Sequence, residues 1–139
     1  MHDEKIELPL HILVIDDQRS MRSIMRELLH QIGVRDIATA SDGEKGLEYL
    51  RRPMEDFPDL IICDLHMENM DGMEFCNAVR RDQALRNHHV PIIILTGDRD
   101  KLLHEVAQQV GAVSVVTKPI TAEELKVVIC EQVGFALAS

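Results

Sequence analysis

Four short apolar runs along the chain are each followed by a polar residue of a kind that carries chemistry. HILVI precedes Asp16 and Asp17, LIIC precedes Asp64, IIIL precedes Thr96, and VSVVT precedes Lys118. Continuous apolar runs of this length are typical of strands buried on both faces of a parallel sheet. If the runs are such strands, three carboxylates, a hydroxyl and an ammonium group meet at one edge of the sheet.

Segments with helical periodicity lie between these runs. They are expected over residues 19–32, about 43–50, 73–81, 102–110 and 121–133, with a weaker strand over 36–40. The order is therefore strand then helix, repeated five times with short connections. That alternation predicts an α/β fold in which right-handed crossovers join parallel strands and helices cover both faces of the sheet.

The polar residues after the strands are of the types expected at a site for phosphoryl transfer. Ligands of such sheets bind outside the carboxyl ends of the strands. A bare carboxylate cluster is unfavourable, but it suits a hard cation such as Mg²⁺, and Asp64 then serves as a nucleophile. Lys118 and Thr96 supply charge and a hydroxyl for phosphoryl oxygens. Each residue also has a simpler interpretation; Asp17 alone has even odds of being only a helix cap.

Composition restricts the class of protein. The 139 residues fit one domain, which we place at 10–133, after a lead-in at 1–9 and before a tail at 134–139 too short for an output domain. The formal net charge of −9 argues against nucleic-acid binding. No apolar stretch is long enough for a membrane span, and no secretory signal is evident, so a cytoplasmic location is expected. The three cysteines are expected to be small buried apolar residues.

The segments DDQRSMRSIMRELL, DLHMENMDG, PIIILTGD and VVTKP resemble the response-regulator receiver family of two-component systems, most closely its stand-alone chemotaxis members. The resemblance covers roughly residues 10–133. It implies a flavodoxin-like, doubly wound sheet of strand order 2-1-3-4-5. The chain would then be a phosphoprotein that acts as a signalling module and not as an enzyme, apart from its own phosphorylation and slow self-dephosphorylation.

The resemblance also assigns roles to the site residues. Asp64 would be the phosphoacceptor, and Asp16, Asp17 and Asp64 would bind Mg²⁺ with the backbone carbonyl of His66. Thr96 would be the hydroxyl that moves toward the phosphoryl group, and Lys118 would be its ion-pair partner. The phosphoryl donor would be a phosphohistidine on a sensor histidine kinase or a phosphotransfer domain.

Two positions depart from the pattern of the family, and three others are expected to border the phosphoryl group. Val115 stands where the family often has an aromatic residue that couples to phosphorylation, and Glu68 stands where a proline is common. By resemblance, His66 and Asp98 border the phosphoryl group and set how fast water removes it. Gly97, beside Thr96, would leave room for a donor histidine or a water molecule.

These features support one leading function and several alternatives. The leading one is a phosphorylation-controlled interaction module, chemotaxis-like, with a motor or other protein as effector and with no nucleic-acid or membrane partner. The lack of an aromatic at Val115 gives weight to a phosphorelay intermediate or phosphate sink. A dehalogenase-type phosphatase would need an aspartate in place of His66. A scaffold that is never phosphorylated would normally lack part of the site.

Two further patterns have weaker interpretations. His88 and His89 are adjacent, so their side chains are expected to diverge in a solvated loop more readily than to bind a metal. The stripe Arg19, Arg22 and Arg26 either docks an acidic kinase or phosphotransfer helix or simply solubilises its helix.

Overall fold

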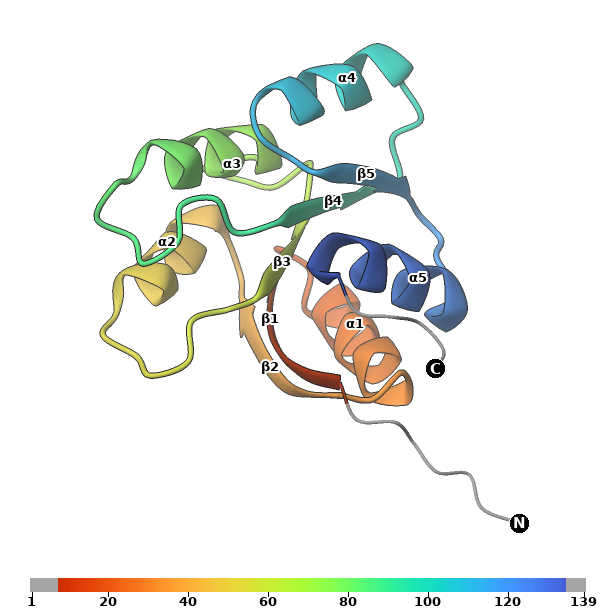
Figure 1. Cartoon of the computed structure of the whole chain (residues 1–139). Helices are drawn as coiled ribbons and strands as arrows, with labels where there is room; N and C mark the ends of the chain where they lie inside the picture. Colours follow the sequence, from red (N-terminus) through yellow and green to blue (C-terminus); the bar gives the residue numbers. More distant parts are fainter. Residues whose placement is uncertain (1–7, 135–139) are drawn as a thin grey trace.

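The computed structural model describes residues 8–134 and has five strands alternating with five helices (Figure 1). The elements are β1 (Leu8–Ile15), α1 (Arg19–Gln31), β2 (Val34–Ala40), α2 (Gly43–Arg51), β3 (Leu60–Asp64), α3 (Gly72–Arg81), β4 (Ile92–Thr96), α4 (Lys101–Gln109), β5 (Ser114–Thr117) and α5 (Ala122–Val133). All strand pairs are parallel, in the order β2-β1-β3-β4-β5. The predicted fold class and strand order are confirmed.

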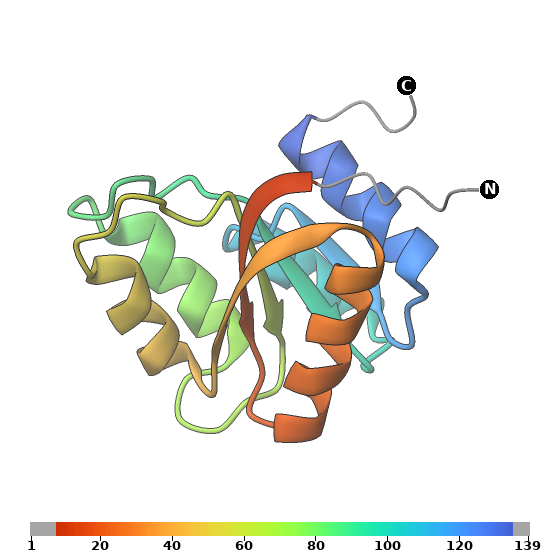
Figure 2. The same ribbon diagram turned by 90° about the horizontal axis from the view of Figure 1, so that it is seen from below.

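The helices form a layer on each face of the sheet. Helices α1 and α5 cover one face, and α2, α3 and α4 cover the other (Figures 1 and 2). Successive residues of a strand point to opposite faces of the sheet. In β1, Leu13 and Ile15 pack on the side of α2 and α3. Ile12 and Val14 pack on the side of α1 and α5. Because the central strands are buried on both sides, they are continuously apolar, as the sequence pattern indicated.

Local signals account for most helix starts. Asp42, Asp71 and Asp100 cap α2, α3 and α4 by accepting backbone N–H groups, and Thr121 caps α5 in a capping box with Glu124. The N-cap of α1 is Gln18, without a side-chain hydrogen bond, so the interpretation of Asp17 as a cap is wrong.

Strand starts were less well predicted. β1 begins at Leu8, before the expected domain start, because Leu8 still pairs with Val34 across an irregularity that ends at His11. β2 begins at Val34, two residues early, for the same reason. The rest of the lead-in and the tail after Gly134 lie outside the described residues. Among residues 8–134, no helix has the length and apolar character needed to cross a membrane.

Candidate functional site

The three carboxylates of the predicted site come together at the carboxyl ends of β1 and β3. Ile15 pairs with Cys63, so the residues that follow them, Asp16 and Asp64, stand at the same level of the sheet. One carboxylate oxygen from each of Asp16, Asp17 and Asp64 lies within 4.8 Å of the others. Asp16 is buried, with 4% of its surface exposed. The parallel register thus places the buried Asp16 and the half-buried Asp64 side by side, and the exposed Asp17 joins them from the loop after β1.

Lys118 supplies the positive charge of the site. Its Nζ lies 3.6 Å from Asp16 Oδ2 and 3.6 Å from Asp64 Oδ2. The lysine follows β5, and its backbone N–H donates a 2.7 Å hydrogen bond to the carbonyl of Thr96. The peptide bond from Lys118 to Pro119 is cis. The Lys118 ammonium group thus balances charge on Asp16 and Asp64, but among the described residues no ion pair joins it to Asp17, the third carboxylate of the cluster.

Thr96 is the last residue of β4 and only 1% exposed. Its neighbour Leu95 pairs with Asp64, so the threonine lies one position beyond the level of the carboxylate. Thr96 Oγ1 accepts a 3.1 Å hydrogen bond from the backbone N–H of Asp98. Its own hydroxyl proton is still available to an acceptor, and a phosphoryl oxygen is such an acceptor.

The environment of Asp64 raises the pKa of its carboxyl above the ordinary value. Burial is the largest cause, and the nearby Asp16 carboxylate acts in the same direction. The Lys118 ammonium and the backbone N–H groups of Leu65 and His66 lower the pKa in part. Charge on Asp64 is therefore disfavoured by its surroundings, and a cation placed among the carboxylates would relieve that cost.

His66 and Asp98, the two positions expected to border the phosphoryl group, contact each other directly. His66 Nε2 lies 3.0 Å from Asp98 Oδ2. The pKa of Asp98 is held below the ordinary value, first by the backbone N–H of Asp100 and next by His66. His104 Nε2 donates to the Asp98 backbone carbonyl at 2.6 Å. Sequence patterns placed the two residues near the site but gave no sign that they pair.

Gly97, Glu68 and Val115 occupy the surroundings of the site. A Cβ added to Gly97 would meet no atom within 4 Å, so the space beside Thr96 is open. The exposed Glu68 donates its backbone N–H to Asp17 Oδ2 at 3.4 Å. Val115 is half-buried and packs against the core layer of α2, α3 and α4.

Two residues connect to the site or to its strand in ways that sequence reasoning missed. Arg22 Nη1 donates a 2.7 Å hydrogen bond to the backbone carbonyl of Asp16. This basic residue of α1 therefore supports the loop after β1, which neither earlier interpretation of the arginine stripe included. His11, buried in β1, binds the Tyr49 hydroxyl through Nε2 at 2.8 Å.

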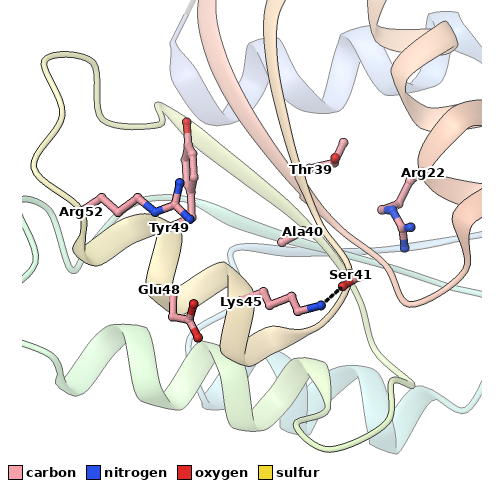
Figure 3. Close-up of a pocket in the computed structure, with 8 residues that line it drawn as sticks. All are labelled: Arg22, Thr39, Ala40, Ser41, Lys45, Glu48, Tyr49 and Arg52. Atoms are coloured by element: carbon pink, nitrogen blue, oxygen red, sulfur yellow. Dashed lines mark hydrogen bonds between the residues drawn. The ribbon is translucent and has the colours of Figure 1, made fainter.

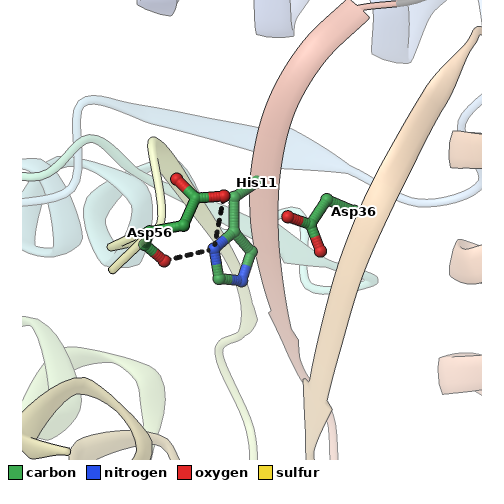
Figure 4. Close-up of side chains that lie close together, drawn as sticks. All are labelled: His11, Asp36 and Asp56. Atoms are coloured by element: carbon green, nitrogen blue, oxygen red, sulfur yellow. Dashed lines mark hydrogen bonds and ion pairs between the residues drawn. The ribbon is translucent and has the colours of Figure 1, made fainter. Parts of the chain in front are cut away.

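His11 also belongs to a second cluster of potential metal ligands, with Asp36 and Asp56 (Figure 4). Figure 4 shows the two carboxylates on opposite sides of the imidazole ring. His11 Nδ1 lies 2.7 Å from the Asp56 carbonyl, and Tyr49 occupies Nε2. Since both ring nitrogens have protein partners, this cluster is a structural tie between β1, α2 and the loop before β3.

The remaining predictions have mixed outcomes. Cys63, Cys76 and Cys130 are buried free thiols, as expected, and burial raises the pKa of Cys76 to about 12. The prediction that His88 and His89 diverge is wrong, because their ring centroids are 4.1 Å apart. His88 Nδ1 lies 3.0 Å from the Arg80 carbonyl, which holds its ring in place.

The open parallel sheet, with three acidic residues and a lysine at its carboxyl edge, has the arrangement expected of a receiver domain. Comparison with known families agrees: residues 12–130 match the response regulator receiver domain, and the chain belongs to that family. The chain is 36% identical over 120 residues to a probable chemotaxis protein CheY of Rhizobium etli, which covers 86% of this chain and 89% of that protein.

Solved structures show the same fold. The chemotaxis protein CheY4 of Vibrio cholerae superposes with a TM-score of 0.77 at 29% identity, covering 88% of this chain and 98% of that one. The receiver domain of a Pseudomonas aeruginosa sensor histidine kinase gives a TM-score of 0.78 at 24% identity, covering 92% and 100%. That domain was solved with a magnesium ion coordinated in its active-site cleft.

Proposed function

We propose that the receiver domain of this chain accepts a phosphoryl group on Asp64 from a phosphohistidine donor. The observation that carries the proposal is the convergence of three carboxylates and Lys118 at one sheet edge. Membership of the receiver family and similarity to CheY proteins support it. The domain would occupy residues 10–133, act in the cytoplasm and have a sensor kinase or phosphotransfer domain as its partner.

The residues present fit a magnesium ion. Asp16, Asp17 and Asp64 offer oxygen ligands from two neighbouring strands, and the backbone carbonyl of His66 would complete the protein's share of the site. The three carboxylates outnumber the single nearby ammonium group, so a divalent ion would balance the remaining negative charge. When bound, Mg²⁺ would supply positive charge to the oxygens of the transferred phosphoryl group.

The chain's own residues would then carry the transfer. A carboxylate oxygen of Asp64 forms a bond to phosphorus as the bond between phosphorus and the donor imidazole nitrogen breaks. The imidazole leaves with the bonding electron pair, and Asp64 becomes an acyl phosphate. Lys118, 3.6 Å from Asp64 Oδ2, holds positive charge beside the phosphoryl oxygens, and the Thr96 hydroxyl donates to one of them.

Metal dependence tests this function. The full chain incubated with acetyl phosphate and Mg²⁺ is expected to gain the mass of one phosphoryl group, which peptide mapping places on Asp64. Excess EDTA is expected to remove the gain, because the carboxylates then repel the incoming anion. Intact-protein mass spectrometry measures both. No uptake with Mg²⁺, or equal uptake in EDTA, contradicts the proposal.

The phosphorylated domain would act in one of two ways: it would bind an effector protein, or it would pass on or store the phosphoryl group. We favour a chemotaxis-like switch, because the chain is 36% identical to a probable chemotaxis protein CheY and 35% identical to a second CheY protein, and it covers 89% and 90% of them. A relay intermediate or phosphate sink is the second candidate, favoured by Val115, whose short, stiff side chain has no large group to reorient. Effector binding that is the same with and without beryllofluoride would assign the chain to the second candidate.

The His66–Asp98 contact yields a prediction about phosphoryl lifetime. The pair spans the surface between the loop after β3 and the loop after β4. His66→Ala removes that bridge and is expected to speed loss of the phosphoryl group several-fold by admitting water. The lifetime is measured by mass spectrometry after removal of the donor. His89→Ala is the control, since this exposed histidine lies outside the site. Equal lifetimes in wild type and His66→Ala would contradict the prediction.

A further inference from the structure

A pocket of about 580 Å³ lies between α1, the end of β2 and α2 (Figure 3). Its lining includes three cationic side chains, Arg22, Lys45 and Arg52, and a single carboxylate, Glu48. This local excess of positive charge stands in a chain of net charge −9. We propose that this cationic pocket binds a compact polyanion that carries phosphate groups.

Each cation of the pocket is held in place by a neutral partner. Arg22 donates to the Asp16 backbone carbonyl at 2.7 Å, and Lys45 Nζ donates to Ser41 Oγ at 3.1 Å. In Figure 3, Lys45 reaches Ser41 from α2 while Arg22 stands on the side of α1. Because a carbonyl and a hydroxyl carry no charge, these contacts position the two cations without neutralising them.

Arg52 is held in a similar way. Its guanidinium carbon lies 5.9 Å from the centroid of the Tyr49 ring, and the hydroxyl of Tyr49 is itself fixed by His11 at 2.8 Å. Glu48 is close in sequence to both Lys45 and Arg52, yet among the described residues no ion pair within 4.0 Å joins it to either. The positive charge of the pocket therefore remains available to a ligand.

The chemistry of the lining favours phosphate. Guanidinium groups bind phosphate through pairs of N–H donors, and ammonium and hydroxyl groups add donors without imposing a plane. Arg22 offers five N–H donors, and the contact with Asp16 uses one of them. A volume of about 580 Å³ falls within the usual range for small-molecule sites and exceeds what a single phosphate fills. An organic phosphate or a diphosphate matches both the charge and the space.

Arg22 also connects the cationic pocket to the candidate phosphoacceptor site. The carbonyl that it binds belongs to Asp16, whose carboxylate stands beside Lys118. A polyanion that draws the Arg22 guanidinium into the pocket would weaken that contact. Binding in the pocket rests on geometry that is independent of phosphorylation, so it is testable in the unmodified protein.

Titration with inorganic pyrophosphate in EDTA tests the proposal. The full chain is expected to bind one equivalent by calorimetry, with amide NMR shifts centred on Ser41 and Lys45. Lys45→Gln and Arg52→Gln are each expected to weaken binding by roughly tenfold, because each removes a charge-assisted contact. Arg26→Gln is the matched control: it removes an exposed cation of α1 one turn from Arg22 but outside the pocket, and should change the affinity less than twofold.

Four results would overturn the assignment. The first is no binding at millimolar pyrophosphate in the folded wild-type protein. The second is equal weakening by Arg26→Gln and Lys45→Gln, which would show general charge attraction. The third is a set of NMR shifts centred on Thr96 and Lys118, which would place the anion at the phosphoacceptor site. The fourth is tighter binding of a poly-glutamate peptide at the same residues, which would assign the pocket to an acidic protein partner.

Discussion

Asp64→Asn is expected to reduce phosphoryl uptake from acetyl phosphate to background while the fold stays intact. The amide is nearly the same size as the carboxylate but is not a nucleophile that forms an acyl phosphate. The substitution also removes one of the carboxylates that repel one another at the sheet edge, so no loss of stability is expected. Intact-protein mass spectrometry and thermal unfolding measure the two effects.

Asp71→Asn is the matched control for that experiment. Asp71 is also an aspartate of the segment between β3 and α3, but it caps α3 and is not one of the clustered carboxylates. Asparagine caps helices about as well as aspartate, so this variant should fold and take up one phosphoryl group. Full uptake by Asp64→Asn would show that Asp64 is not the acceptor. Equal loss of uptake in both variants would show that the loss is not specific to Asp64.

Arg80→Met is expected to lower the free energy of unfolding by about 2–4 kcal/mol. The Arg80 guanidinium donates hydrogen bonds to the backbone carbonyls of His88, Val90 and Gly111 at 2.7–3.2 Å. It thereby ties α3 to the segments that lead into β4 and β5. Methionine keeps the apolar stem of the side chain but leaves these carbonyls without their donor.

Urea unfolding of Arg80→Met and Arg81→Met measures the free energy of unfolding of each variant. The comparison separates the contribution of the Arg80 hydrogen bonds from the effect of removing one positive charge. Arg81 is the next residue of α3 and is exposed, so its replacement should change the free energy of unfolding by no more than about 0.5 kcal/mol. A similar loss in the two variants would mean that the hydrogen bonds of Arg80 contribute little. Phosphoryl uptake should survive in both, because neither residue touches the carboxylate cluster.

The fold and the position of the site were predictable because both depend on local patterns. Apolar runs of four or five residues alternated with helical periodicity, which is enough to predict a parallel sheet. The carboxyl ends of parallel strands meet at one edge, so Asp16, Asp64 and Lys118 were expected to lie together, and they do. Their chemical roles came from the resemblance to the receiver family and remain proposals.

Contacts between distant segments were not predictable. Arg80 gave no signal, because a basic residue near a helix end is usually solvated and its carbonyl partners come from two other segments. The pairing of His66 with Asp98 depends on how close two loops come, which no sequence spacing encodes. The His11–Tyr49 contact likewise joins a strand to a helix that lies 38 residues away.

The position of Lys118 in the sheet has a mechanical consequence. Asp16 and Asp17 follow β1, and Asp64 is the last residue of β3; both strands have a hydrogen-bonded strand on each side. Lys118 instead follows the edge strand β5, whose four residues are only half-buried. Asp16 and Asp64 are therefore held by central strands, whereas Lys118 is held by an edge strand. Displacement of β5 would break strand hydrogen bonds on one side only, whereas displacement of β1 or β3 would break them on both sides.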